Sequence, residues 1–250
     1  MLIAGMLSTF PAVIINSFIT PGAVLFFSGG DASLTLIENI TIIVSAPVGE
    51  EICKALAVFS LAGMIDSKKR GFQVGFTVGL GFALLENLQY ILFSLFAGEV
   101  MAFSYGLTSV IRGIGSIPGH AMWTACSGYA IGHILEQRKS PQQIPDVQQW
   151  NLVNPRKPAE KSYASHQFSA QSYFSKPSDL QLPTSLPVML SIAIFGHAFW
   201  NGSSVLISMA SQRLDPVVGL IAELTWIVVL VVLLWTVGRF VIAAAMEDGR

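Results

Sequence analysis

Eight ionisable or amide side chains interrupt four otherwise apolar stretches of the sequence. A carboxylate that is shielded from water can act as a general base on a bound water molecule. A histidine or an asparagine can donate a hydrogen bond to the oxyanion that forms when this water attacks an amide carbonyl. These residue types therefore predict hydrolysis. The eight residues are Glu50, Glu51, Lys54, Glu86, Asn87, His120, His197 and Asn201.

The spacing of these residues indicates which of them share a helical face. Glu50 and Lys54 are four positions apart, so we expect them to pair and to keep Glu50 ionised. Glu51 lies about 100° further round the helix and is expected to point elsewhere. His197 and Asn201 are also four positions apart and can address one small ligand or water together.

A metal ion is an alternative way to activate the water. Two histidines and a carboxylate can hold a zinc ion whose bound water becomes the nucleophile. The candidate ligands are His120, His197 and Glu86. The sequence contains no His-Glu-x-x-His motif, so such a site would have to assemble in three dimensions. Zinc and a metal-independent mechanism both stay open at this point.

The composition is that of a membrane protein. Of the 250 residues, 52% are hydrophobic and 12% are charged, whereas an average globular domain has about 25% charged residues. The net charge of −1 gives no indication of a nucleic-acid partner. Cys53 and Cys126 each lie in an apolar stretch and form neither a disulfide framework nor a metal pair. We therefore expect the lipid bilayer to be the main surrounding.

The apolar stretches predict an all-α, polytopic bundle of about six transmembrane helices. A span needs about 20 mostly apolar residues, and a kink is expected at Pro47. Residues 136–185 are rich in Gln, Ser and Pro, which predicts a polar, mobile cytoplasmic loop within one membrane-embedded domain, residues 1–250. The predicted spans are residues 2–27, 34–62, 72–97, 107–134, 186–210 and 217–241.

Basic residues predict the orientation of these spans, because cytoplasmic loops retain Lys and Arg. Six alternating spans place the basic loop at Lys68, the basic part of residues 136–185 and the terminal Arg250 on one side. Both termini are therefore predicted to be cytoplasmic. The first apolar run has no Lys or Arg ahead of it, so we interpret it as a retained helix, with a cleaved signal peptide as the alternative.

Four motifs in this order resemble the PrsW family of intramembrane proteases, which is distantly similar to CaaX-prenyl proteases and bacteriocin-processing enzymes. The resemblance covers about residues 45–205 without the polar loop, and the first span lies outside the motif set. The motifs are Glu50-Glu51-x-x-Lys54, Phe82-x-x-x-Glu86-Asn87, His120 followed by Gly128, and His197-x-x-x-Asn201.

The resemblance implies an intramembrane endopeptidase of a prokaryotic plasma membrane that cleaves a membrane protein or peptide. It implies that Glu50 or Glu51 is the general base and that His120 and His197 are further catalytic residues. Asn201 would assist the oxyanion, and Glu86 and Asn87 would complete the site. The family is often described as metalloproteases, while a glutamate mechanism without metal is argued for its relatives.

Two other classes of function remain as alternatives. Intramembrane Glu and His residues also serve as proton relays in transporters, although no inverted repeat is evident in this sequence. A receptor or scaffold could keep the same cavity as a binding site without catalysis. Arg112 and Glu223 also lie near spans and are candidates for gating or for pairing at the membrane interface.

Overall fold

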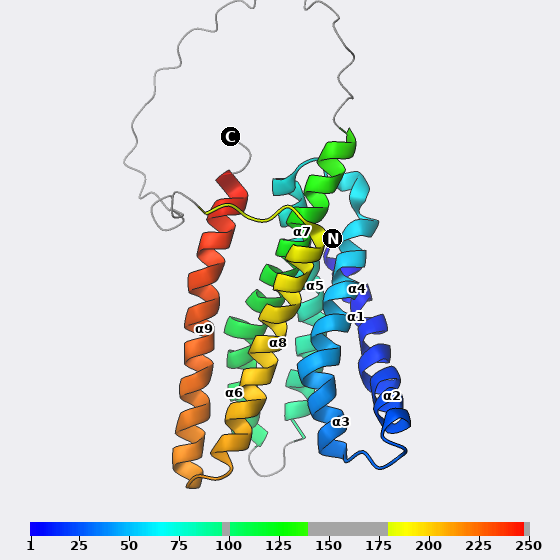
Figure 1. Ribbon diagram of the computed structural model, residues 1–250. Helices are drawn as coiled ribbons and strands as arrows, with labels where there is room; N and C mark the ends of the chain where they lie inside the picture. Colours follow the sequence, from blue (N-terminus) through cyan, green and yellow to red (C-terminus); the bar gives the residue numbers. More distant parts are fainter. Residues whose placement is uncertain (97–100, 140–179, 248–250) are drawn as a thin grey trace, which may run out of the picture.

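The computed structural model describes residues 1–96, 101–139 and 180–247, and these residues form a bundle of helices without strands (Figure 1). The expected all-α fold is therefore confirmed. Three short π-helical segments, η1, η2 and η5, continue directly into α-helices. The elements are α1 (Leu2–Ile14), η1 (Ile15–Ile19), α2 (Thr20–Phe27), α3 (Leu34–Ile40), η2 (Thr41–Ser45), α4 (Ala46–Ser60), η3 (Ala62–Met64), α5 (Lys68–Ser94), α6 (Met101–Ile111), η5 (Arg112–Ser116), α7 (Ile117–Lys139), α8 (Leu186–Ser211) and α9 (Pro216–Glu247).

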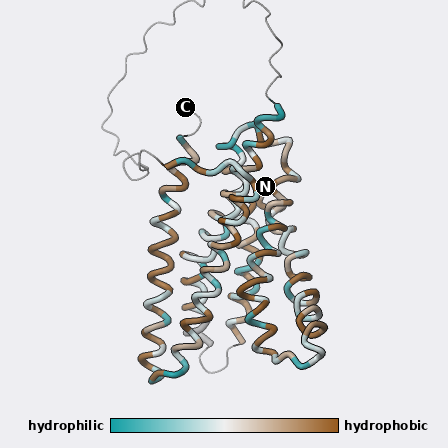
Figure 2. Tube along the Cα trace, in the orientation of Figure 1, coloured by the Kyte–Doolittle hydropathy of each residue, from teal (hydrophilic) through white to brown (hydrophobic). Residues whose placement is uncertain are grey.

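Four of the described helices are long and apolar enough to cross a membrane. They are Leu2–Phe27, Lys68–Ser94, Leu186–Ser211 and Pro216–Glu247. Hydrophobic residues run along most of α8 and α9, and hydrophilic residues gather at the ends of the bundle (Figure 2). The α3–α4 and α6–α7 stretches contain more polar residues but lie in the same bundle (Figure 1). That all six stretches cross the bilayer stays a prediction.

Several helices extend beyond the predicted apolar windows. Helix α5 begins at Lys68 and α7 continues to Lys139, because polar residues can continue a helix outside the hydrocarbon layer. Residues 136–139, which we assigned to the polar loop, therefore belong to α7. Residues 140–179 of that predicted loop lie outside the described part of the chain.

The described basic residues from which we predicted the orientation lie at one end of the bundle. Figure 1 shows that the N-terminus, the start of α5 and the ends of α7 and α9 lie toward this end. Lys68 and Lys69 begin α5, and Arg138 and Lys139 end α7. This arrangement agrees with an even number of spans, and the cytoplasmic assignment of this end stays a prediction.

Each π-helical segment is followed, after one residue, by a proline. Pro21, Pro47 and Pro118 occupy these positions behind η1, η2 and η5. Proline lacks an N–H and its ring crowds the carbonyl four residues earlier, which favours a widened turn at these three positions, whereas Pro11 lies inside the α-helix α1. The kink expected at Pro47 thus takes the form of a widened turn, in which the Ala46 N–H bonds the Thr41 carbonyl.

The contact between α5 and α7 is the most extensive in the bundle and depends on small residues. A Cβ atom added at Gly79 would collide with the carbonyl oxygen of His120, and one added at Gly75 would lie 2.5 Å from the carbonyl oxygen of Thr124. Small residues that let two backbones approach are a common basis of helix packing in membranes. The apolar core lies along the same contact and includes Phe72 and Tyr129.

This close approach predicts that Gly79→Ala destabilises the protein. The added methyl group must push α5 and α7 apart, which should cost about 1–3 kcal/mol of the free energy of unfolding. Thermal unfolding in detergent measures the change. Gly22→Ala is the matched control, since Gly22 is also helical and has no neighbouring atom within 4 Å of the added Cβ. An unchanged midpoint for Gly79→Ala would show that this contact is loose.

Candidate active site

The ammonium group of Lys54 lies at the centre of a buried polar cluster. Its Nζ is 2.7 Å from Glu51 Oε1 and 3.6 Å from Glu50 Oε2. The same atom hydrogen-bonds to His120 Nδ1 at 2.7 Å, and it lies 4.2 Å from the centre of the Phe82 ring. Lys54 and Glu51 have no exposed side-chain surface. The charge of Lys54 therefore has to be balanced by these neighbours, because water does not reach it.

This geometry extends the expected pairing on α4. Lys54 pairs with Glu50 at 3.6 Å, as predicted, but its shorter contact, at 2.7 Å, is with Glu51. Positions three and four apart on a helix both share a face with the reference residue, so spacing alone could not decide between the two carboxylates. Glu51 was expected to point elsewhere and instead lies inside the cluster.

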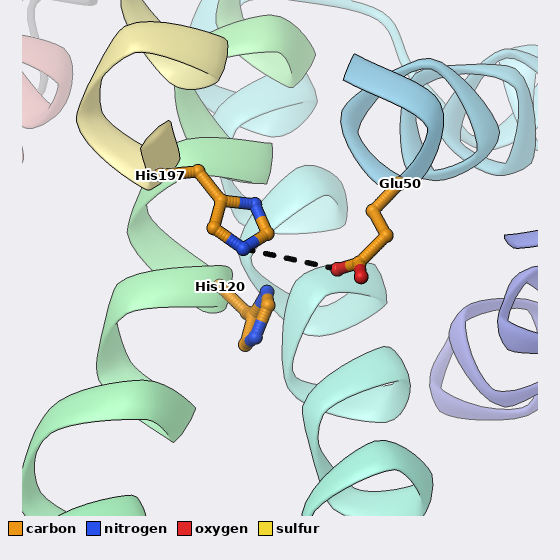
Figure 3. A group of neighbouring side chains, drawn as sticks. All are labelled: Glu50, His120 and His197. Carbon is orange, nitrogen blue, oxygen red and sulfur yellow. Dashed lines mark ion pairs between the residues drawn. The ribbon is translucent and has the colours of Figure 1, made fainter. Parts of the chain in front are cut away.

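Glu51 also fixes the orientation of His197 on α8. His197 Nδ1 lies 3.1 Å from Glu51 Oε1. A carboxylate accepts hydrogen bonds, so Nδ1 carries the ring proton and the opposite nitrogen, Nε2, is left with a lone pair. This Nε2 faces Glu50 Oε2 at 3.9 Å (Figure 3). The indole of Trp123 stacks on the His197 ring at 4.7 Å between ring centres, which restricts the ring further.

The opposite proton arrangement holds for His120 on α7. Lys54 donates to Nδ1, so the proton of the neutral ring is on Nε2, which lies 3.0 Å from Glu86 Oε2. Arg112 lies 3.6 Å from the same Glu86 oxygen. Its guanidinium also donates to Asn87 Oδ1. Glu86 therefore has a ring N–H and a guanidinium as neighbours.

Of the two adjacent carboxylates on α4, Glu50 is the one that faces open space. It lines a cavity of about 300 Å³ together with Glu86, His120, His197 and Asn201. Its Oε2 atom is buried and has no hydrogen-bond partner among the described residues. Polar buried atoms are normally paired, so this oxygen is placed for a water or a ligand.

The π-helical segments surround this cavity. Asn16 of η1, Ile42 of η2 and Arg112 of η5 all line it. Asn201 Nδ2 donates to the Ile42 carbonyl at 3.1 Å. Each widened turn contributes a side chain to the cavity, so the prolines that follow these turns shape the site.

Asn16 is a site residue that sequence reasoning missed. Its Nδ2 donates to Glu50 Oε1 at 3.3 Å, and Ser45 Oγ donates to its Oδ1 at 3.2 Å. An amide in the middle of the first apolar run was the available signal. Glu223, in contrast, accepts a hydrogen bond from Ser211 Oγ and does not line the cavity.

The donor set fits a zinc ion in type and spacing. One ligand atom each from Glu50, His120 and His197 lies within 4.8 Å of the others (Figure 3), and two histidines with one glutamate are a common catalytic zinc set. The Glu51 contact to His197 Nδ1 is the outer support that such ligands usually have. To bind through Nε2, His120 would need its ring proton on Nδ1, so the contact in which Lys54 donates to Nδ1 would have to change. Glu86, predicted as the third ligand, lies outside this group.

Comparison with known proteins agrees with the geometry. The sequence profile of the PrsW family intramembrane metalloproteases matches residues 1–153, more than half of the chain. The chain belongs to this family. No curated protein and no solved structure matches the chain.

Family membership confirms the resemblance that the motifs indicated and adds one correction. The matched residues 1–153 include the first helix, which the expected extent of about residues 45–205 left out, and Asn16 of this first helical stretch contacts Glu50. The matched range ends before α8, so the tertiary contacts are what bring His197 into the cluster.

The cluster predicts that Lys54→Met strongly destabilises the protein. Without the ammonium group two buried carboxylates lose their main cation, and breaking a buried pair in this way costs about 3–5 kcal/mol. Thermal unfolding in detergent is the measurement. The added substitution Glu51→Gln should restore part of the loss, while Lys69→Met, at an exposed position, should leave the midpoint unchanged. A stable Lys54→Met variant would argue against a charged lysine.

Proposed function

We propose that this member of the PrsW family is an endopeptidase that hydrolyses a peptide bond of a membrane-associated protein, with the attacking water activated at Glu50. The observation that carries the proposal is the buried Glu50 Oε2 at the cavity, which accepts no hydrogen bond from the described residues and lies 3.9 Å from His197 Nε2. A general base must lie within reach of the water that it deprotonates. A water between Glu50 and His197 would meet two acceptors.

The contacts favour Glu50 over Glu51 as this base. Glu51 does not line the cavity, and its Oε1 contacts both Lys54 and His197. Glu51 is therefore a positioning residue, which holds the ring of His197 with Nε2 toward Glu50. The two carboxylates follow each other in sequence but have different roles.

Two groups can stabilise the oxyanion. Asn201 lines the cavity and uses its Nδ2 for one bond to Ile42, but an amide nitrogen has two protons to donate. His120 has its Nε2–H at the wall of the same cavity, and this proton would have to turn from Glu86 Oε2, 3.0 Å away, to the oxyanion. Donors of this kind act in a region that contains little water, where each contributes strongly.

Zinc is the alternative to this scheme. Glu50, His120 and His197 would then hold the ion instead of acting as base and oxyanion donor, and a bound zinc ion would supply Lewis-acid activation of the water. Glu86 is then the remaining carboxylate at the cavity.

Glu50→Gln should abolish proteolysis. Loss of a general base typically lowers a rate by about 10²–10⁴-fold, and the amide keeps the shape of the side chain. Mass spectrometry of new protein termini in membranes of cells that express the wild type or the variant measures cleavage. Glu38→Gln is the control, because Glu38 lies exposed on the same helical stretch. Termini that persist in the Glu50→Gln membranes would contradict the proposal.

Chelator-treated protein should take up one zinc ion per chain in equilibrium dialysis. His197→Ala should remove this binding, because it deletes one of the three donors. His133→Ala is the control, since His133 contacts Gln137 and does not line the cavity. Full proteolytic activity of metal-free wild-type protein would instead assign water activation to Glu50 alone.

A further inference from the structure

A second cavity leads to the same carboxylates from the side of the bundle. Its volume is about 510 Å³, which is within the range of ligand-binding cavities. Residues of α1 and η1 form one wall and residues of α5 form the other. Both cavities are lined by Asn16, Glu50, Glu86 and Tyr90. The two spaces therefore meet at the proposed catalytic carboxylates.

The outer rim of this second cavity lies on the surface of the bundle. Val13 is 38% exposed and Phe93 is 70% exposed, and both line the cavity. Apolar residues with this exposure in a membrane-spanning helix face lipid. The opening therefore faces the bilayer from between α1 and α5.

Two polar residues at this opening have no partner. Ser17 on η1 and Gln89 on α5 line the cavity and are exposed. Neither side chain makes a hydrogen bond to any part of the chain that the structure describes. An unsatisfied polar group in the hydrocarbon layer costs several kcal/mol, so these residues are expected to have a ligand there.

We propose that the gap between α1 and α5 admits an extended segment of a transmembrane substrate from the bilayer. The main-chain amides of this segment would pair with Ser17 and Gln89 and lead it to Glu50. The inference rests on the proposed proteolytic function and adds the route and the conformation of the substrate.

The chemistry of the two side chains favours an extended segment over an intact helix. A glutamine amide offers one acceptor and two donor protons, which match the C=O and N–H groups of an extended backbone. A helix satisfies its own backbone groups internally and offers nothing to Gln89. Hydrolysis also requires a carbonyl that is free to accept hydrogen bonds from the site.

Photo-crosslinking to a defined peptide tests the route without using cleavage. The protein carries Glu50→Gln, so that the peptide stays intact, and p-benzoylphenylalanine replaces either Val13 or Ile14. Val13 lines the cavity; Ile14 is its neighbour, 53% exposed and outside the lining. The probe is a biotinylated transmembrane peptide of leucine and alanine with a central Gly-Pro pair, reconstituted with the protein in liposomes.

The crosslinking yield at position 13 should exceed that at position 14 by at least about threefold. It should fall about threefold when Gln89→Leu is added, the loss expected for one hydrogen bond. The control Leu88→Ala alters an exposed neighbour outside the cavity and should have no effect. Unfolding midpoints confirm that each variant is folded.

Two results would overturn the route. Equal yields at positions 13 and 14 would show that no peptide occupies the cavity, and equal yields with an uninterrupted Leu/Ala peptide would show that intact helices bind as well. Cleavage of the Gly-Pro peptide by the protein with native Glu50 is measured separately. Selective crosslinking without cleavage would support the route and count against the proteolytic function. Cleavage without selective crosslinking would support the proteolytic function and count against the route.

Discussion

The ammonium group of Lys54 joins the helices that form the site. A fully buried charge is tolerated only where opposite charges and hydrogen-bonding groups surround it. Lys54 finds these groups in Glu51 of its own helix and in His120 of α7. Glu51 in turn contacts His197 of α8, and His120 contacts Glu86 of α5. One buried cation thus links α4, α5, α7 and α8. Lys54 sets which nitrogen of His120 carries a proton, and its partner Glu51 does the same for His197.

Prolines and glycines create the space around this cluster by opposite means. The three prolines behind η1, η2 and η5 open the helices at the level of the cavity, and each widened turn contributes a residue to its wall. The glycines of α5 let α7 approach so closely that His120 lies beside Phe82, 5.4 Å between ring centres. The bundle is therefore dense at the α5–α7 contact and open between the widened turns.

An intramembrane protease has to bring water and a peptide to one carboxylate within an apolar surrounding. The arrangement around Glu50 meets this requirement with two cavities that share a wall. One is lined by both histidines, Asn201 and Arg112, and the other lies between α1 and α5 at the surface of the bundle. The two cavities reach Glu50 from different directions, as the proposed entry of water and substrate requires. The first helical stretch, which carries none of the four family motifs, contributes to both spaces through Asn16.

The sequence by itself determined the all-α membrane fold, the family and most residues of the cluster. These are local signals, because a long apolar run specifies a membrane helix and a charge within it stands out against its neighbours. Only the tertiary structure decided that Lys54 is closer to Glu51 than to Glu50, that Glu50 faces the cavity, and that Asn16 belongs to the site. The rotation and depth of each helix determine which side chains meet, and these depend on packing against helices that are distant in sequence. A single asparagine in an apolar run, such as Asn16, gives no sign of its partner until the neighbouring helix is in place.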